Sequence, residues 1–181
     1  MTTSDVKAIA KTGEEAVDGI KTPSDIIKIP QPRAEDEVLR EAYAKAGTLK
    51  VTKEEAKILA REFADEEVSK NQDGLLYIEH IYISERLTEA FGPGQWCVIE
   101  SNKWTEPAPG RPDQRIVYGD YVLVVRGAYI AKATASHPTN RKTGVDDAQE
   151  SCRSVALRRL AAKSSLGCGN QVWKKAYCQG S

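Results

Sequence analysis

The sequence contains few of the features that mark enzymes, metal sites or membrane proteins. Among 181 residues there are only two histidines and four cysteines, and no two cysteines form a C-x-x-C pair. A zinc site is therefore not expected. No apolar run approaches the roughly 20 residues that span a bilayer. We find no P-loop, no G-x-S-x-G motif and no glycine-rich dinucleotide fingerprint. These absences predict a non-enzymatic chain without cofactor, metal or membrane partner, which acts by binding.

Targeting signals are also missing from the N-terminus. The first residues contain no apolar segment of the secretory signal type. Acidic groups at Asp5, Glu14, Glu15 and Asp18 do not fit a mitochondrial transit peptide, which is rich in arginine and poor in acids. The composition therefore predicts a cytoplasmic protein with reduced thiols, in a bacterial or phage-infected cell rather than in a mitochondrion.

Charge is balanced over the whole chain but not along it. Lys and Arg total 26, as do Asp and Glu, so the net charge is zero and gives no overall attraction to nucleic acid. Residues 1–101 hold 13 basic and 20 acidic groups, whereas residues 102–181 hold 13 and 6, which leaves the halves at −7 and +7. The second half is the candidate surface for a polyanion. The same asymmetry suits self-association, with the acidic half of one copy against the basic half of the next.

The chain divides into an arm and one domain. Residues 1–48 mix small, charged and proline positions with few aromatics. This composition predicts a flexible N-terminal arm, with no more than a short helix near residues 35–46. Residues 49–181 are long enough to form a single domain with a buried core.

The domain begins with two helical patterns. Thr52 and Glu55 form a capping box at the start of the first, which continues towards residue 70. Residues 75–92 begin as an extended segment and become an amphipathic helix, which ends at the Gly92-Pro93 pair. We expect one side of this helix to consist of Ile81, Ser84, Leu87, Thr88 and Phe91.

Three strand-like runs and a long helix complete the domain. The runs cover residues 96–104, 115–126 and 128–136, and imperfect alternation in the second predicts a β-bulge near Gly119. The helix starts at Asp146. Its apolar face is expected to contain Ala148, Cys152, Val155, Ala156, Leu160 and Ala161. The fold class is therefore α+β: a three-stranded antiparallel β-meander packed on a long helix, a β-β-β-α core preceded by helices.

Basic and aromatic side chains supply the two ingredients of single-stranded DNA binding. Cations along a groove neutralise phosphates, and flat rings stack on bases at roughly 1–3 kcal/mol each. The basic candidates are Arg153, Arg158, Arg159 and Lys163 on the long helix, with Lys174 and Lys175 in a short helix beyond it. The aromatic candidates are Tyr77, Trp104, Tyr118 and Tyr121. In the alternative interpretation, the arginines form a solvated helix face and the rings belong to the core.

Two blocks of the sequence resemble a known family. The first, from Gly74 to Trp96, reads GLLYIEHIYISERLTEAFGPGQW, and the second, from Glu150 to Trp173, reads ESCRSVALRRLAAKSSLGCGNQVW. Both are similar to blocks of the fungal mitochondrial genome maintenance recombinases, in the same order and with strands between them. That family lies within the Rad-fifty-two-type single-strand annealing superfamily. The resemblance implies a three-stranded sheet and a helix that build rings with a basic groove.

The resemblance also implies a function. It predicts ATP-independent binding of single-stranded DNA and annealing of complementary strands in recombination and DNA repair. The acting form would be a homo-oligomeric ring or filament, with a single-strand-binding protein as an optional partner. A coat protein that protects single strands without pairing them is the first alternative. A nuclease, which no cluster of acids near the basic helix supports, and a structural oligomer without nucleic acid are the others.

Site residues follow from the resemblance as well. Tyr77 stands 19 positions before Trp96, the spacing at which the superfamily places an aromatic residue of its inner DNA groove. The alternative is a tyrosine of the core. Arg158 and Arg159 follow Leu157 as a basic pair follows leucine in the superfamily's groove-lining helix. The resemblance therefore assigns both arginines to phosphate contacts.

Four further basic residues complete the expected site. Arg153 matches a basic position of the second block, and either contacts DNA or pairs with Asp146 or Glu150 on its own helix. Lys163 is the next basic side chain along that helix. Charge alone adds two more residues, Lys174 and Lys175.

Overall fold

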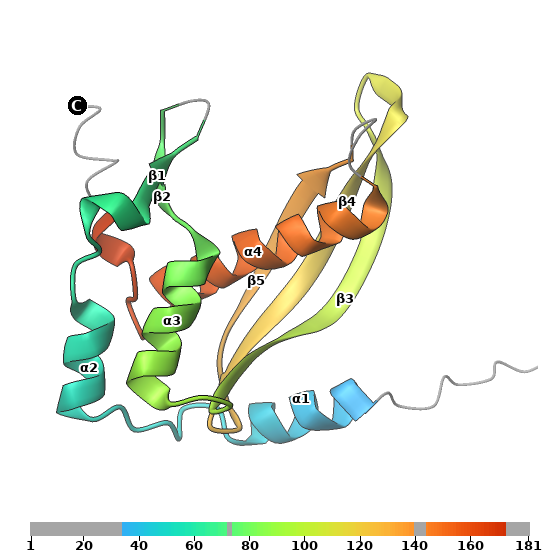
Figure 1. Ribbon diagram of the computed structural model, residues 1–181. Coiled ribbons are helices and arrows are strands. Elements are labelled where there is room, and N and C mark those ends of the chain that lie inside the picture. The colour runs from blue at the N-terminus through green and yellow to red at the C-terminus, as the bar shows by residue number, and fades with distance from the viewer. Residues whose placement is uncertain (1–33, 72–73, 140–143, 173–181) are drawn as a thin grey trace, which may run out of the picture. The chain divides into compact units, whose positions relative to one another are not determined.

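The computed structural model describes residues 34–71, 74–139 and 144–172 (Figure 1). The helices are α1 (Ala34–Ala44), α2 (Lys53–Ala60), α3 (His80–Phe91) and α4 (Val145–Lys163), with a 3₁₀ turn, η2, at Asp65–Glu67. The strands are β1 (Val68–Lys70), β2 (Leu76–Ile78), β3 (Trp96–Ala108), β4 (Arg111–Val125) and β5 (Ala128–Pro138). Most of the expected arm, and the short helix expected around Trp173, lie outside the described residues.

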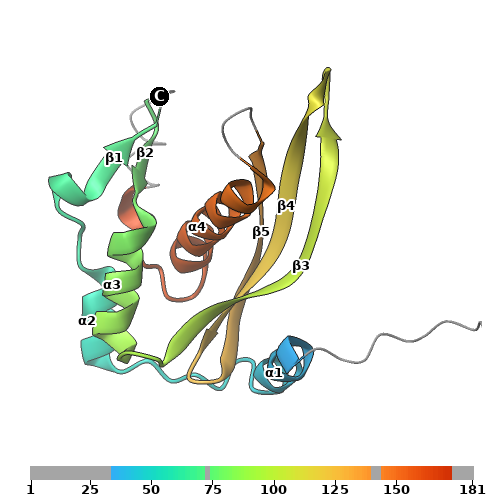
Figure 2. The ribbon, with the colours of Figure 1, turned by 45° about the vertical axis from the view of Figure 1, so that its right-hand side comes forward.

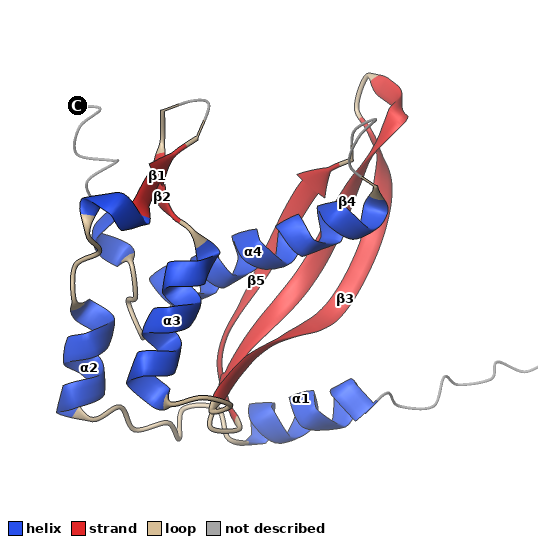
Figure 3. Cartoon of the chain, viewed as in Figure 1, coloured by secondary structure: helices blue, strands red, loops and turns tan. Residues whose placement is uncertain are grey.

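A three-stranded antiparallel sheet in the order β3-β4-β5 forms the centre of the fold. The long helix α4 crosses one face of this sheet (Figures 1 and 3), where it contacts mainly β4 and β5. The short helix α1 packs on the other face, near the turn between β4 and β5 (Figure 2). There Leu39 and Ala42 meet Val122 and Val124. The α+β fold with a β-meander on a long helix is thereby confirmed.

The short helix expected near residues 35–46 is present as α1. Acidic residues fill its first turn, where they interact favourably with the positive end of the helix dipole. Its apolar residues Leu39 and Ala42 are buried on the sheet. The arm boundary at residue 48 stays a prediction, although α1 lies on its N-terminal side and packs against the domain.

Helix α2 is shorter than its sequence pattern indicates. Its start is the expected capping box: the Glu55 N–H donates to Thr52 Oγ1 at 3.2 Å, and the Thr52 N–H donates to Glu55 Oε2 at 2.8 Å. The helix ends at Ala60 instead of continuing to residue 70. At this end the buried guanidinium of Arg86 donates to the carbonyl of Arg61 at 2.5 Å. Arg86 thus satisfies a carbonyl that no helical N–H reaches, and the chain turns through η2 into β1.

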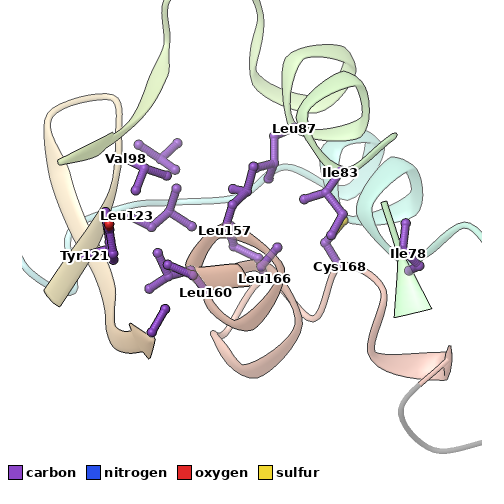
Figure 4. Packing of buried hydrophobic residues seen from close by; sticks show 14 of the residues in the cluster. Ile78, Ile83, Leu87, Val98, Tyr121, Leu123, Leu157, Leu160, Leu166 and Cys168 are labelled. Atoms are coloured by element: carbon purple, nitrogen blue, oxygen red, sulfur yellow. The ribbon is translucent and has the colours of Figure 1, made fainter. Parts of the chain in front are cut away.

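The main hydrophobic core lies between the sheet, α4 and α3 (Figure 4). Its members include Leu87 of α3, Val98 and Leu123 of the sheet, and Leu157 and Leu160 of α4. Full burial of each such side chain contributes roughly 1.5–3 kcal/mol. Because both α3 and the sheet pack on it, α4 is fixed on two sides, and this fixes the side chains that it carries.

The predicted apolar faces of the helices are only partly right. On α3, Ile81 is 48% exposed, whereas Ile83 is buried. On α4, Val155 is half-buried and Leu157, which was not in the predicted face, is buried. In both cases a second partner covers the helix: α3 packs on α2 as well as α4, and α4 on α3 as well as the sheet. The spacing of apolar residues along a helix predicts one buried face. It does not reveal that a second neighbour buries another face as well.

Gly119 makes room for a ring and does not mark a bulge. The side chain of Tyr121 is buried beside it, and a Cβ on Gly119 would lie 2.5 Å from Tyr121 Cε2. The nearest register irregularity lies in the neighbouring strand β3, between Glu100 and Asn102. The prediction of a bulge near Gly119 in β4 is therefore wrong, because the irregularity lies in the neighbouring strand β3. A glycine inside a strand can mark either a bulge or a place where another group packs closely, and the sequence does not distinguish the two.

Candidate nucleic-acid interface

The hairpin of β1 and β2 carries Tyr77 to the side of α4. The strands pair antiparallel, with Ser69 opposite Tyr77. At the turn, the side-chain oxygen of Asn71 accepts from the backbone N–H of Leu75 at 2.8 Å, as asparagine does in tight turns. At the base of the hairpin, Ile78 is buried in the main core. The hairpin is therefore anchored at its base and closed at its turn.

The guanidinium of Arg158 lies over the ring of Tyr77. Its central carbon is 4.8 Å from the ring centroid, inside the roughly 6 Å reach of a cation–π contact. Both side chains are half-buried. Burial lowers the pKa of Arg158, and the nearby Tyr77 opposes that effect. Arg158 is nevertheless a cation in neutral solution, because an arginine titrates far above that range.

Arg159 points to a different side of the helix, towards β5. Its Nη1 donates to the backbone carbonyl of Thr134 at 2.6 Å. Thr134 is opposite Asp120 of β4, and the carbonyl of Asp120 faces β3, where it accepts from the hydroxyl of Ser101. In an antiparallel sheet, two residues opposite each other point their N–H and C=O groups either both toward each other or both away. Because the Asp120 carbonyl points away from β5, the Thr134 carbonyl points away from β4, to the outside of the sheet. Arg159 thus covers a polar group on the open edge of β5.

Arg159 lies between two hollows. One, of ≈ 400 Å³, lies between the hairpin and α4 and is lined by Asn71, Leu75, Leu76, Tyr77, Val155, Arg158 and Arg159. The other, of ≈ 390 Å³, lies between α4 and β5 and is lined by Ala131, Lys132, Ala133, Thr134, Arg159, Leu160, Lys163 and Ser164. Arg159 lines both of them. We call the two hollows together the cationic groove.

The walls of the cationic groove differ in chemistry. The hairpin wall is apolar and aromatic, with Tyr77 and with Leu75, which is 57% exposed. The α4 wall carries the two arginines and the exposed Lys163. On the β5 wall, the Lys132 ammonium pairs with Asp120 at 2.9 Å, and this hydrogen bond holds the pKa of Asp120 below its ordinary value. The other basic residues that line the groove, Arg158, Arg159 and Lys163, all lie on α4.

The other flank of α4 faces a larger hollow that is rich in carboxylates. It has a volume of ≈ 900 Å³ and lies between α3, β3 and the first half of α4. Its acidic residues are Glu35, Glu100, Asp146 and Glu150. Arg153 also lines it, and donates from Nη2 to the carbonyl of Val98 at 3.5 Å. We call this hollow the acidic cleft.

The structure brings together only some of the residues that the sequence assigned to DNA. Those that line the cationic groove are Tyr77, Arg158, Arg159 and Lys163. Arg153 lies in the acidic cleft instead. In the part of the chain that the structure describes, no ion pair joins Arg153 to Asp146 or Glu150. The two lysines predicted from charge alone, Lys174 and Lys175, lie outside the described residues.

The other aromatic candidates lie away from the cationic groove. Tyr121 belongs to the core, where burial raises the pKa of its phenol and its hydroxyl donates to the Gln149 carbonyl at 3.4 Å. Trp104 and Tyr118 stack on one another, with 5.2 Å between ring centroids. For Tyr121 the core interpretation is thus right. Tyr77 was predicted either to contact DNA or to belong to the core. It is half-buried and lines the groove, so its burial lies between these two interpretations.

Sequence reasoning missed the β5 wall and the apolar part of the hairpin wall. The missed residues are Leu75, Val155, Lys132 and Thr134. Alternation of alanines with Lys132 and Thr134 indicates a strand with one polar face. It does not indicate which strand edge the arginines of α4 reach, because that depends on where the helix lies across the sheet.

The described residues show no feature of a metal site or a membrane span. Among them, no three His, Cys, Asp or Glu side chains are grouped so that they could hold a metal ion. No helix in the same part of the chain is both long and apolar enough to cross a membrane. The cysteines there are free thiols: Cys97 is exposed, and Cys152 and Cys168 are buried. The chemistry that the site does offer is a row of cations beside an apolar and aromatic wall.

Fold and groove together define a class of protein: a β-β-β-α domain whose long helix presents cations to a groove. We next compared the sequence with models of known protein families. The family model described as "Mitochondrial genome maintenance MGM101" matches residues 39–180, which is most of the sequence. The chain belongs to the mitochondrial genome maintenance MGM101 family.

Curated relatives come from several fungi and carry the name mitochondrial genome maintenance protein MGM101. The Candida albicans protein is 30% identical over 146 residues, which cover 74% of this chain and 49% of that protein. The Candida parapsilosis protein is 28% identical over 148 residues, covering 77% and 53%. The Kluyveromyces lactis protein is 26% identical over 136 residues, covering 75% and 49%. The chain thus spans about half the length of these relatives.

The comparisons overturn the predicted localisation. A cytoplasmic protein of a bacterial or phage-infected cell was expected, but the relatives are fungal proteins named for maintenance of the mitochondrial genome. The expectation rested on four acidic groups among the first 18 residues. The charge of one short segment is a weaker indicator than the family of a whole domain.

Proposed function

We propose that this chain binds single-stranded DNA in the cationic groove and promotes annealing of complementary strands, without ATP and as an assembly of several copies. The observation that carries the proposal is that Arg159 lines both hollows, with Arg158 and Lys163 on the same helix. A flexible polyanion suits such a groove, because successive phosphates can meet successive cations.

A single strand fits the walls better than a duplex does. The cations of α4 offer contacts to a sugar-phosphate backbone, and the hairpin offers the exposed side chain of Leu75 to apolar or flat groups. A duplex buries its bases in its own stack and presents phosphates on the outside only. The apolar hairpin wall therefore has a use in a single-strand complex that it lacks in a duplex complex.

The proposed role is binding and not catalysis. Base pairing supplies the driving free energy of annealing, on the order of 1.4 kcal/mol per step. The protein contributes by neutralising phosphates, by removing hairpins from the strands and by raising the rate at which strands meet. None of these tasks needs nucleotide hydrolysis or a metal ion.

Side-by-side assembly would turn short grooves into a continuous track. The chain's charge asymmetry of −7 and +7 between its halves supports a head-to-tail contact between copies, which closes into a ring or extends into a filament. In either arrangement the α4 helices of neighbouring copies would follow one strand. Its bases would stay available for pairing.

The names of the relatives support a role in genome maintenance. Each of the fungal proteins is named for maintenance of the mitochondrial genome, a task in which strand annealing serves recombination and repair. Because the chain spans about half the length of these relatives, we propose for it the DNA-binding and annealing part of that role.

An annealing assay at matched saturation tests the proposal. Two complementary fluorescent oligonucleotides are each covered with protein, to a level fixed by gel shift, and then mixed without ATP. We expect pairing to be faster than in protein-free solution. Saturated binding without acceleration would make the chain a coat protein instead. The absence of any gel shift at low ionic strength would refute DNA binding itself.

A further inference from the structure

The hairpin wall presents one aromatic ring to the cationic groove, and that ring already has a partner. The guanidinium of Arg158 lies over Tyr77 at 4.8 Å from the ring centroid. A ring face in contact with a guanidinium cannot at the same time stack on a nucleobase. A strand that enters the groove would therefore meet the stacked pair and not a free ring on that face.

Tyr77 is anchored through the strands around it. Its strand β2 pairs with β1, where Ser69 is its cross-strand neighbour, and the Ser69 hydroxyl donates to Glu79 Oε1 at 2.9 Å. The next residue, Ile78, is buried and packs so closely on the chain at Gly169 that a Cβ there would lie 2.7 Å from Ile78 Cδ1. A long side chain on a helix, in contrast, has several rotatable bonds to immobilise before it can hold a ligand.

We propose that Tyr77 is a positioning residue: it fixes the guanidinium of Arg158 in the groove, ready to receive a phosphate, and does not itself stack on bases. The inference deepens the proposed function and rests on it. The cation–π contact uses the flat face of the guanidinium and leaves N–H donors at its edge free for phosphate oxygens. An arginine held in this way loses less rotamer freedom when the phosphate binds.

The neighbouring arginine is held by comparable means on the other wall. Arg159 is fixed to the Thr134 carbonyl at 2.6 Å, so the two adjacent arginines are kept apart, one at the hairpin and one at β5. Phosphates of a strand that crosses α4 would meet these two fixed cations in turn. Recognition of this kind is independent of the bases, and this property separates it from stacking.

The test compares strands with and without bases. Fluorescence anisotropy measures the Kd of the full chain for two labelled oligonucleotides of equal length, an oligothymidylate and a strand of abasic sugars, over a series of salt concentrations. The variants are Tyr77→Leu, which removes the ring, Tyr77→Phe, which keeps it, Arg158→Ala, and Tyr77→Leu combined with Arg158→Ala. Thermal unfolding of each variant checks its fold, and Tyr77→Met replaces Tyr77→Leu if the latter does not fold.

A positioning role predicts the same loss on both strands. Tyr77→Leu is expected to weaken binding by about fivefold, whether or not bases are present, and to flatten the slope of log affinity against log salt towards that of Arg158→Ala. Tyr77→Phe keeps the ring and should bind both strands as tightly as the unaltered chain does. In the Arg158→Ala background, Tyr77→Leu should cause no further loss, because both changes remove the same fixed cation.

Two other results would overturn the inference, and they differ from a failure of the proposed function. A loss confined to the oligothymidylate, or a loss that adds fully to that of Arg158→Ala, would make Tyr77 a base-stacking residue while DNA binding stands. If the unaltered chain binds neither strand at low salt, the proposed function is wrong, and the positioning role falls with it.

Discussion

The two flanks of α4 belong to one helix but carry opposite chemistry. The flank that faces the hairpin and β5 opens on the cationic groove with Arg158 and Arg159, whereas the flank that faces α3 and β3 opens on the acidic cleft. Each flank also sends one arginine to the carbonyl of an edge strand: Arg159 to Thr134 at 2.6 Å, and Arg153 to Val98 at 3.5 Å. The same residue type therefore makes the same kind of contact in two different electrostatic surroundings.

The difference shows that an arginine's place on the helix decides what it can bind. Five residues along an α-helix are separated by about 140° around its axis, so Arg153 and Arg158 cannot share a flank. The carboxylates around Arg153 cancel much of its attraction for a phosphate. None of the described residues that line the cationic groove is a carboxylate, although Glu79 lies near enough to Arg158 to raise its pKa, and Asp120 pairs with Lys132. On the proposed function, we therefore expect ligand binding on the flank of the cationic groove and a structural role for Arg153 on the other.

Removal of both groove arginines should have the largest effect. We expect Arg158→Ala combined with Arg159→Ala to weaken single-strand binding by about a hundredfold at low salt, since each charge-assisted contact contributes roughly 1.5 kcal/mol. The slope of log affinity against log salt should fall by about two at most. Anisotropy titrations over a salt series measure both quantities.

A matched control for this pair is Arg40→Ala. Arg40 is an exposed arginine of α1, on the face of the sheet opposite α4. Its loss changes the net charge but should leave the affinity within about twofold. If the double variant kept an unchanged salt slope, or if Arg40→Ala matched it, the flank distinction would be lost.

Damage beneath the acidic cleft should affect stability instead of binding. Gly119→Ala places a Cβ 2.5 Å from the buried ring of Tyr121, whose hydroxyl donates to the Gln149 carbonyl of α4. We expect the free energy of unfolding in urea to fall by about 2 to 3 kcal/mol, as in other overpacked cores. Gly144→Ala is the control, because nothing lies within 4 Å of its added Cβ, and should cost less than about 1 kcal/mol. Equal costs for the two variants would mean that the ring has room to move.

Single arginine variants compare the flanks directly. Arg159→Ala should reduce single-strand affinity by about tenfold. Arg153→Ala should change it by less than about twofold, because Arg153 lies among carboxylates. Parallel anisotropy titrations at one salt concentration suffice. The sequence left Arg153 open between a DNA contact and an ion pair, so a tenfold loss for Arg153→Ala would favour the DNA contact and place part of the DNA path in the acidic cleft.

Much of the fold was predictable because it depends on local patterns. The capping box of Thr52 and Glu55 and the apolar spacing in α4 are short-range signals: α2 starts where expected, and α4 starts one residue before the expected Asp146. The first strand was expected to end at residue 104, but β3 continues to Ala108. Pro107 is tolerated there because β3 is an edge strand, where a missing N–H need not break the sheet. Whether a strand lies at an edge is a property of the sheet and not of its own sequence.

The site was less predictable because its contacts join distant segments. The sequence pointed to Tyr77 and Arg158 separately, through a resemblance and through charge, but their stacking depends on how the hairpin packs on α4. The partner of Arg159 is a backbone carbonyl, and any residue at position 134 would supply one. Such contacts leave no mark on residue identity, so only the folded chain shows them.

The smallest expected effect concerns Asp120, which neutralises the lysine of the β5 wall. Hydrogen bonds from Lys132, at 2.9 Å, and from Thr134, at 2.6 Å, lower the pKa of Asp120 from its ordinary value of 3.8. A carboxyl whose pKa is lower in the folded state stabilises the fold above its ordinary pKa, and this stability is lost as pH falls through the folded value. Urea unfolding of Asp120→Asn should therefore depend less on pH below about pH 4 than that of the unaltered chain.

The same substitution asks whether the β5 wall lies on the DNA path. At neutral pH, Asp120→Asn removes the anion that Lys132 pairs with and leaves an uncompensated cation on β5. If a strand crosses from the hairpin to β5, its affinity should rise by about twofold, the size of one weakly screened surface charge. An unchanged affinity would limit the DNA path to the hairpin side of α4, where Arg158 and Arg159 would then have to hold the strand without help from β5.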